Sequence, residues 1–205
     1  MNIYATALAR IELLLHHFLT RTILYLMDGF LIAAASLVGP IFAVYVEHIG
    51  GNIIIAGTAY AVFAVTAGIG VLLFSRFEDN TPNLTTFIAV GYLLASIAYF
   101  FYIFISSPVQ LLIAQAILGL AAAVRVPAYD VFLSKHALKH PLLAWGYWNA
   151  TVYLVSAFSA VVGAALATAF GFRTMLVIIF LLSLVSFFLS VLIIKVHFNE
   201  AIAEE

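Results

Sequence analysis

The stretch LYLMDGFLIAAASLVGPIFAVYV, residues 24–46, decides the fold class, because it is long and apolar enough to cross a bilayer. A hydrocarbon core of roughly 30 Å needs about 20 apolar residues of helix. The stretch nevertheless carries an acid, Asp28, within its first third. A charge at such a depth is costly unless it is paired or hydrated. The stretch therefore predicts a membrane span whose buried acid needs a polar partner or water from outside its own helix.

The composition is that of an integral membrane protein. The chain has 205 residues, of which 66% are hydrophobic and 8% are charged, and its mean hydropathy is +1.20. Soluble domains average about 45–50% apolar and about 25% charged residues, so a soluble domain is excluded. Cysteine is absent, which rules out disulfides and thiolate metal sites. We expect a multi-pass protein in contact with membrane lipid, with no cofactor, no metal and no nucleic-acid partner.

Six apolar stretches have the length of a membrane span. They lie at about 22–46, 53–74, 84–105, 109–133, 142–168 and 173–195. Short breaks rich in Gly, Pro, Asn and Ser separate them, as is typical of turns. The predicted fold is an all-α integral membrane domain of six transmembrane helices over residues 22–195, followed by a polar cytoplasmic tail at 196–205.

Residues 1–21 have a different pattern, because apolar side chains recur at helical spacing while charged residues and histidines interrupt them. The apolar positions are Tyr4, Leu8, Ile11, Leu15 and Phe18. This pattern predicts an amphipathic helix that lies in the membrane interface. A basic leader region and a small-residue cleavage site are missing, so a signal peptide is not predicted.

The distribution of Lys and Arg predicts the orientation, since cytoplasmic loops carry the excess of these residues. With a cytoplasmic N-terminus, the outer loops hold Arg173 alone, and the cytoplasmic side holds all the others outside the helices. These are Arg10, Arg21, Arg76, Lys135, Lys139 and Lys195. Both termini are therefore predicted to be cytoplasmic, in an inner (cytoplasmic) or plasma membrane. Arg125 lies within a predicted helix.

The two halves of the domain match when residues 109–205 are placed over 22–118 with an offset of 87. Pro127 then falls on Pro40, and VPAYDVFL lies over GPIFAVYV. The units 22–105 and 109–195 would each contain three helices. Because three is odd, the second unit would be inverted relative to the first, as in many secondary transporters. Pro40 and Pro127 are the candidate helix hinges.

Four segments, in this order, resemble those of a known family. They are SLVGPIFAVYVEHIG at 36–50, AGTAYAVFAVTAGIGVLLFSRFEDN at 56–80, QAILGLAAAVRVPAYDVFLS at 115–134 and SAVVGAALATAFGFRTMLVIIFLL at 159–182. Over residues 22–195 the chain resembles the six-helix N-terminal half of a major facilitator superfamily transporter. Its motifs depart from the family pattern, since Ser75 stands where the loop after helix 2 usually has an acid, and Gln115 stands where helix 4 often has an arginine.

The resemblance implies that a second six-helix domain completes the transporter, because family members normally carry twelve helices in two domains related by a pseudo-twofold axis. A parallel homodimer would reproduce that architecture. Helices 2 and 5 would then border the opposite domain, and both carry small residues that let helices approach closely in lipid. These are Gly57, Ala61, Ala64 and Gly68 in helix 2, and Ser156, Ala160, Gly163, Ala164 and Ala167 in helix 5. The alternative is that both faces pack within one protomer.

Asp28, Arg125 and Asn149 fall in one layer of the predicted bundle. At 1.5 Å per residue, each lies roughly 6–9 Å to the cytoplasmic side of the middle of its helix. The resemblance implies that helices 1 and 4 line a central cavity, so we expect Asp28 to face that cavity with Arg125 as its partner. Together with Gln115, these residues form the candidate substrate or proton pathway.

The role of Asp28 has three interpretations. It forms a static salt bridge, it exchanges its proton or its partner during transport, or it reaches the interface near Arg21. The aromatic residues near the predicted cytoplasmic helix ends have two interpretations. They form an interfacial belt, or they form a stacking surface for an aromatic or cationic substrate. They are Tyr25, Tyr129, Trp145, Tyr147 and Trp148.

The predicted function is that of a half-size secondary transporter that moves a small solute by alternating access as a parallel homodimer, with Asp28 as the site of proton coupling. Two alternatives are a substrate-binding membrane subunit of a larger ATP-driven system and a non-transporting accessory subunit. An enzyme is not expected, because the chain has no Gly-x-Ser-x-Gly, no His-Glu-x-x-His and no aspartate dyad within a helix.

Overall fold

The computed structural model describes the backbone of residues 3–79, 83–136 and 140–203, and the side chains of residues 18–79, 83–136 and 140–195. All regular elements in these ranges are helices. In chain order they are α1 (Ile3–Val38), the 3₁₀ turn η1 (Gly39–Ile41), α2 (Phe42–His48), α3 (Ile53–Glu78), α4 (Leu84–Tyr102), α5 (Pro108–His136) and α6 (Pro141–Ala203). The predicted all-α class is therefore confirmed.

Among the described residues, five helical segments are long and apolar enough to cross a membrane. They are Phe18–His48, Ile53–Glu78, Leu84–Tyr102, Pro108–His136 and Pro141–Lys195. The chain is accordingly a multi-pass helical membrane protein. The last segment has 55 residues, which would make a straight helix of about 80 Å, far longer than a bilayer is thick.

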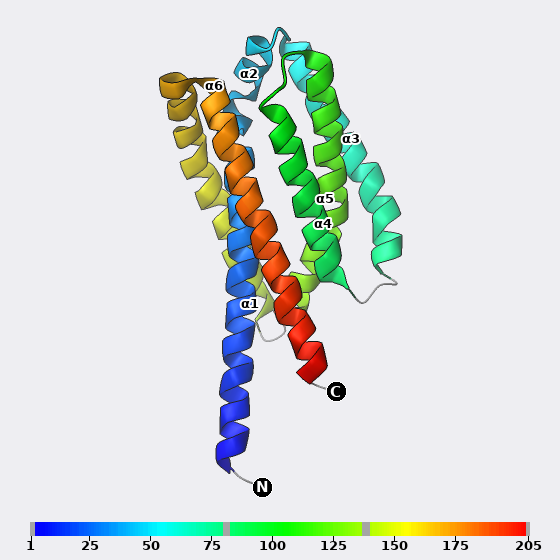
Figure 1. The fold of residues 1–205 in the computed structure, drawn as a ribbon, viewed down its shortest axis with the longest axis vertical. Helices are drawn as coiled ribbons and strands as arrows, with labels where there is room; N and C mark the ends of the chain where they lie inside the picture. The colour runs from blue at the N-terminus through cyan, green and yellow to red at the C-terminus, as the bar shows by residue number, and fades with distance from the viewer. Residues whose placement is uncertain (1–2, 80–82, 137–139, 204–205) are drawn as a thin grey trace.

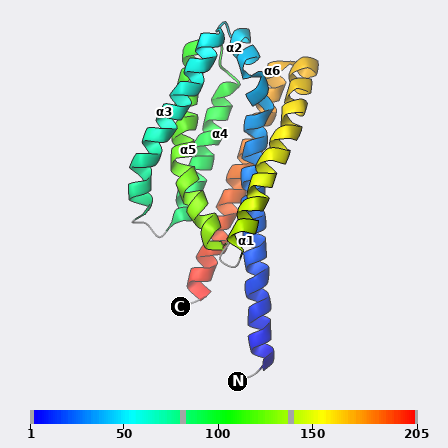
Figure 2. The same ribbon diagram turned by 180° about the vertical axis from the view of Figure 1, so that it is seen from behind.

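Gly171 explains the length of α6. Its φ of 80° and ψ of 164° are not helical, and such a positive φ is readily adopted only by glycine. The chain reverses direction there, so that α6 consists of a first arm, residues 141–170, and a second arm, residues 172–203, that run in opposite directions (Figures 1 and 2). This turn lies in the break between the stretches 142–168 and 173–195 of the sequence.

The N-terminal helix is longer than a single span. α1 continues without a break from Ile3 to Val38, and its first turns extend beyond the rest of the bundle (Figure 1). The sequence predicted a boundary near residue 21, whereas the backbone runs through that position as one helix. The placement of residues 1–21 at the membrane interface stays a prediction.

The two candidate hinge prolines lie in different backbone environments. At Pro40 the first span changes from α-helix to the 3₁₀ turn η1 and then resumes as α2. Proline causes such breaks because it lacks an N–H group and its ring clashes with the carbonyl one turn earlier. Pro127 lies inside α5, which continues on both sides of it. Their role as hinges, and the inverted repeat that pairs them, stay predictions.

The helices pack as two pairs joined by α4. α1 packs on α6, α3 packs on α5, and α4 packs on both α5 and α6. Glycines allow the closest approaches. A Cβ on Gly119 of α5 would lie 2.7 Å from the Phe63 carbonyl oxygen of α3, and a Cβ on Gly163 of α6 would overlap the Leu37 carbonyl of α1.

The small-residue face predicted for helix 5 is therefore used partly inside the protomer. Gly163 is buried against Leu37, and the Ser156 hydroxyl is hydrogen-bonded to the Ser36 hydroxyl of α1 at 3.0 Å. Gly163 and Ser156 both contact α1 of the same chain, and their place at a dimer interface stays a prediction. Ala160, Ala164 and Ala167 are partly exposed. The helix 2 face differs, since Gly57, Ala61, Ala64 and Gly68 are all exposed.

Replacing Gly163 with alanine should destabilise the fold, because the added methyl group collides with backbone of α1 that has no room to move. Overpacking of this kind costs about 1–3 kcal/mol. We expect Gly163→Ala to lower the apparent melting temperature of the detergent-solubilised protein. The matched control is Gly146→Ala on the same helix, because a Cβ there meets nothing within 4 Å. An equal loss of stability in both variants would contradict this packing.

Candidate functional site

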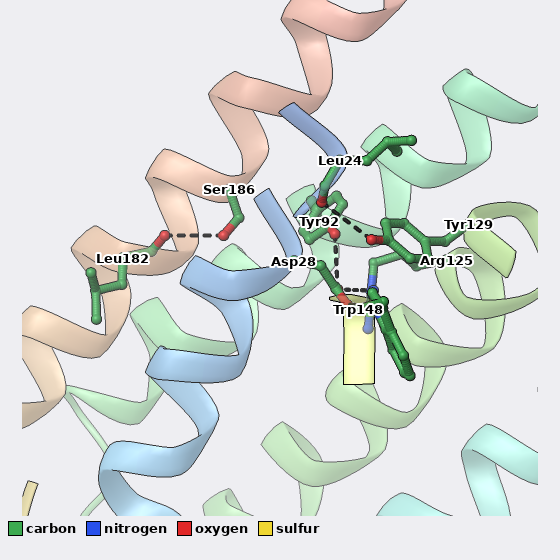
Figure 3. Close-up of polar contacts among 8 residues, drawn as sticks. All are labelled: Leu24, Asp28, Tyr92, Arg125, Tyr129, Trp148, Leu182 and Ser186. Carbon is green, nitrogen blue, oxygen red and sulfur yellow. Dashed lines mark hydrogen bonds and ion pairs between the residues drawn. The ribbon is translucent and has the colours of Figure 1, made fainter. Parts of the chain in front are cut away.

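Asp28 is the centre of a buried polar cluster. It lies on α1 and is 2% exposed. Its Oδ1 accepts hydrogen bonds from the Arg125 guanidinium of α5 and from the Tyr92 hydroxyl of α4, the latter at 3.0 Å. Its Oδ2 accepts one from the Trp148 indole Nε1 of α6 at 2.9 Å. Figure 3 shows these side chains converging on the carboxylate from separate helices.

Arg125 is held by aromatic faces as well as by the ion pair with Asp28. Its guanidinium carbon lies 5.1 Å from the centre of the Tyr92 ring and 5.9 Å from that of Tyr129. A cation in this position is attracted by the negative face of the ring, most strongly where water is excluded. The side chain is 15% exposed. Arg125 therefore has its charge balanced by Asp28 and its guanidinium shielded by two tyrosines.

The close packing of α4 on α5 brings these side chains together. A Cβ on Gly91 would collide with the Cβ of Arg125, so only glycine fits at that position. Gly91 directly precedes Tyr92. The small residue lets the helices approach, and the next residue then reaches both Arg125 and Asp28.

Aromatic residues enclose the cluster on the side toward the N-terminal end of α1. The Tyr129 hydroxyl donates to the Leu24 carbonyl of α1 at 3.2 Å, and the Tyr25 hydroxyl donates to the Ala144 carbonyl of α6 at 3.1 Å. The Trp148 ring lies 6.5 Å from Tyr129 and 5.5 Å from Trp145, measured between centroids. Three of the aromatic residues predicted near the helix ends, Tyr25, Tyr129 and Trp148, therefore lie around the ion pair and connect α1 to α5 and α6.

The sequence located the ion pair but misassigned its third contributor. Asp28 and Arg125 are paired, as their equal depth predicted, and Asp28 does not reach Arg21. Asn149 was expected in the same layer and is not in the cluster. It is exposed, and its amide donates to the Trp145 carbonyl of its own helix at 2.8 Å. The preceding residue, Trp148, contacts Asp28 instead.

Gln115 is separated from the ion pair. It lies ten positions before Arg125 on α5, which is about 15 Å along the helix axis. It is 8% exposed and lines a hollow that also contains Tyr99 and Tyr102. Gln115 is therefore part of a hollow closer to the N-terminal end of α5 and not part of the Asp28 cluster itself.

Sequence reasoning missed three members of the cluster. Tyr92 was not singled out, and Tyr129 and Trp148 were interpreted as part of an interfacial belt or of a stacking surface for a substrate, not as neighbours of Asp28. Depth along the helix was the available signal for Trp148, because it adjoins Asn149. No comparable signal existed for Tyr92, since its contact with Asp28 depends on the rotation of α4 relative to α1.

A family model covers almost all of this arrangement. Residues 24–203 match the Major Facilitator Superfamily. The chain belongs to the major facilitator superfamily. A search of curated proteins finds no match. Members of the major facilitator superfamily are transporters, so the general class of this chain is that of a secondary transporter. Its multi-pass helical fold lies in contact with lipid.

Removing one partner of the buried ion pair should destabilise the protein more than removing both. Breaking a buried pair costs about 3–5 kcal/mol because the remaining charge is uncompensated, whereas apolar replacement of both partners is often neutral. We expect Asp28→Asn and Arg125→Met each to lower the apparent melting temperature, and the double variant to recover much of the loss. A double variant less stable than either single variant would contradict the pairing.

The Trp148 hydrogen bond provides an independent test of the same cluster. Trp148→Phe keeps most of the ring and removes the donor to Asp28, which should cost about 1–3 kcal/mol of stability. Trp145→Phe is the matched control, since the structure gives no hydrogen bond to the Trp145 indole among the described residues. We expect the loss for Trp148→Phe to disappear in an Asp28→Leu background, which has no acceptor for the indole, measured as a double-mutant cycle of melting temperatures.

Proposed function

We propose that this chain is a half-size transporter that moves a small solute across the membrane by alternating access as a parallel homodimer. One protomer supplies six crossings arranged as two inverted units of three helices, with the two arms of α6 as the fifth and sixth. Two protomers would then correspond to the twelve helices of a full-length facilitator. Rocking of one protomer against the other would expose a central cavity, lined by α1 and α5, to each side in turn.

The exposed face of α3 is the observation that carries this proposal. In its most apolar window, 17% of residues are buried, whereas 50% are buried in the corresponding window of α4. The exposed side includes the small residues Gly57, Ala61, Ala64 and Gly68. Lipid covers large apolar side chains well, but a row of small ones favours close approach of another helix. We assign that helix to the partner protomer.

The partner helix in this arrangement is the first arm of α6, by the twofold relation between the protomers. Its outward side carries Ala157, Val161 and Ala165, which are exposed, next to the partly exposed Ala160 and Ala164. α3 and the first arm lie at opposite edges of the protomer (Figure 2). A twofold axis between them pairs each α3 with the partner's first arm, so both exposed edges are covered in one closed dimer.

Asp28 is the residue we assign to proton coupling. It is the acid of the buried cluster, and its charge is balanced by one arginine. Protonation of Asp28 would free Arg125 for another partner and weaken the contact between α1 and α5. The change of access would then follow the proton because the energy of a charge within the membrane depends strongly on its pairing. Both termini would face the cytoplasm, as the distribution of Lys and Arg predicts.

Disulfide cross-linking gives the sharpest test of the dimer, because the chain contains no cysteine. Ala64 and Ala157 both lie near the middle of their helices. We expect the double variant Ala64→Cys and Ala157→Cys to form a covalent dimer in membranes under mild oxidation. The matched control combines Ala64→Cys with Val185→Cys, which is exposed on the second arm of α6. That pair should stay monomeric.

Native mass spectrometry of the protein in nanodiscs provides the complementary measurement. We expect a particle of two chains. A particle of one chain, together with no cross-link for the first pair, would overturn the homodimer. It would favour an accessory subunit or a half that needs a different partner.

Proton coupling is tested with proteoliposomes that contain a pH-sensitive dye. When a transported solute is added outside, the wild-type protein should acidify the interior as the solute enters. Asp28→Asn should abolish the acidification, because an amide cannot release a proton at neutral pH. Folding of the variant is checked by its elution from a sizing column. Undiminished acidification by a folded Asp28→Asn protein would exclude Asp28 as the coupling residue.

A further inference from the structure

A groove runs along the inner face of the protomer on the extracellular side of the Asp28 cluster. It consists of two adjacent hollows of about 160 Å³ and about 320 Å³. The hollows share the lining residues Ala35, Phe63, Tyr99 and Leu118, so they lie side by side. Arg125 lies at one end of the groove, and Gly39 and Phe42, beside the Pro40 break, lie at the other.

Four helices supply most of this groove, and Gly39 of η1 and Phe42 of α2 line one end. α1 and α3 supply its two sides, and α4 and α5, which lie between them in Figure 2, supply its base. Small side chains leave the space open. These are Ala35 of α1, Ala95 of α4, and Ala121 and Ala122 of α5. The groove therefore exists because alanines occupy positions where larger residues would fill the gap between α1 and α5.

Aromatic residues line the groove from both α3 and α4. Tyr60 and Phe63 of α3 form one pair, with ring centroids 6.2 Å apart. Tyr99 and Tyr102 of α4 form another, with centroids 5.9 Å apart. Tyr60 is 67% exposed, so its ring is accessible in the protomer. Rings on two different helices can contact both faces or a face and an edge of one planar molecule.

Two polar groups give the groove a means of orientation. The Tyr99 ring lines both hollows, and its hydroxyl has no hydrogen bond to any described residue. The Gln115 side chain interacts with the Tyr102 hydroxyl. An amide carries two donor hydrogens and a carbonyl acceptor, so this contact leaves part of its capacity for a solute. The groove can thus both donate and accept hydrogen bonds.

The groove has no net charge to attract an ion. Arg125 is the charged residue among those that line the two hollows, and Asp28 balances its charge. A solute with an unpaired charge would lose its hydration and gain no opposite charge in return. We therefore expect the groove to exclude charged solutes, even those whose aromatic ring would fit it.

We infer that the solute bound in this groove is a neutral, planar aromatic molecule with a hydrogen-bonding substituent. This rests on the proposed function for its role as a transported solute, but the binding itself does not require transport. Stacking on the rings of α3 and α4 supplies affinity, and Tyr99 and Gln115 fix the orientation. The paired Asp28 and Arg125 close the groove on the cytoplasmic side and keep its charge at zero.

Four molecules of nearly equal size separate these contributions. Benzamide is neutral and planar, benzoate and benzamidine replace its amide by an anion and a cation, and cyclohexanecarboxamide keeps the amide but lacks the aromatic ring. Binding is measured by saturation-transfer-difference NMR on the full chain in nanodiscs, with empty nanodiscs to subtract partition into lipid. We expect benzamide to bind with a Kd in the millimolar range or tighter, because so small a molecule makes few contacts. The other three should bind at least about tenfold more weakly, which corresponds to about 1.4 kcal/mol.

Matched variants assign the binding to the groove. Phe63→Leu should weaken benzamide binding, and Phe101→Leu, an aromatic residue outside the groove, should leave it unchanged. Tyr99→Phe should weaken it several-fold, in line with the loss of a hydrogen bond of about 1 kcal/mol. Tyr153→Phe, at a position that is 72% exposed, is its control.

The outcomes distinguish this inference from the proposed function. Equal binding of benzamide and cyclohexanecarboxamide, preferred binding of benzoate or benzamidine, or full binding by Phe63→Leu would overturn the inference. A cross-linked dimer that binds none of the four would also overturn it, because a helix of the partner would then fill the groove, while the homodimer would stand. Selective benzamide binding by a one-chain particle would support the inference and contradict the homodimer.

Discussion

The fold depends on how one carboxylate is stabilised inside a membrane. Asp28 is almost fully buried, and it accepts hydrogen bonds from Tyr92, Arg125 and Trp148. These donors come from α4, α5 and α6. In lipid, helices gain little from burying apolar side chains as such, so interhelical hydrogen bonds, together with close packing at small residues, determine which helices meet and in which rotation. The hydrogen bonds that stabilise the Asp28 carboxylate therefore hold α1, α4, α5 and α6 in fixed relative positions.

The same cluster explains the character of the groove that begins at Arg125. Because Asp28 neutralises Arg125, the groove ends at a charged residue without carrying a charge. Tyr92 and Tyr129 lie beside the guanidinium on two sides, and Arg125 lines the end of the groove. A change in the protonation of Asp28 would alter the packing of α1 on α5 and the charge of the groove together. Coupling between a proton and a solute needs such a shared element.

α3 is the helix that this polar cluster leaves out. It contributes no hydrogen bond to Asp28 among the described contacts, and it packs on the rest of the protomer through α5 and α2. Gly119 brings α5 and α3 together on one side of α3, and the other side is exposed with its small residues. A helix held on one side only is the expected edge of a domain that is completed by another. This is the physical basis for assigning the exposed face to a second copy of the chain.

The sequence by itself determined the class of the protein and the positions of its apolar segments, and it placed Asp28 and Arg125 at one depth. These follow from the length of apolar stretches, from punctuation by Gly and Pro, and from depth, which residue counting gives directly. Only the tertiary structure decided that Trp148 and not Asn149 contacts Asp28, that Tyr92 joins the cluster, and that Gly163 packs on Leu37 of the same chain. Successive residues of a helix point about 100° apart, so depth alone leaves the facing direction open. That direction is set by the packing of several helices at once.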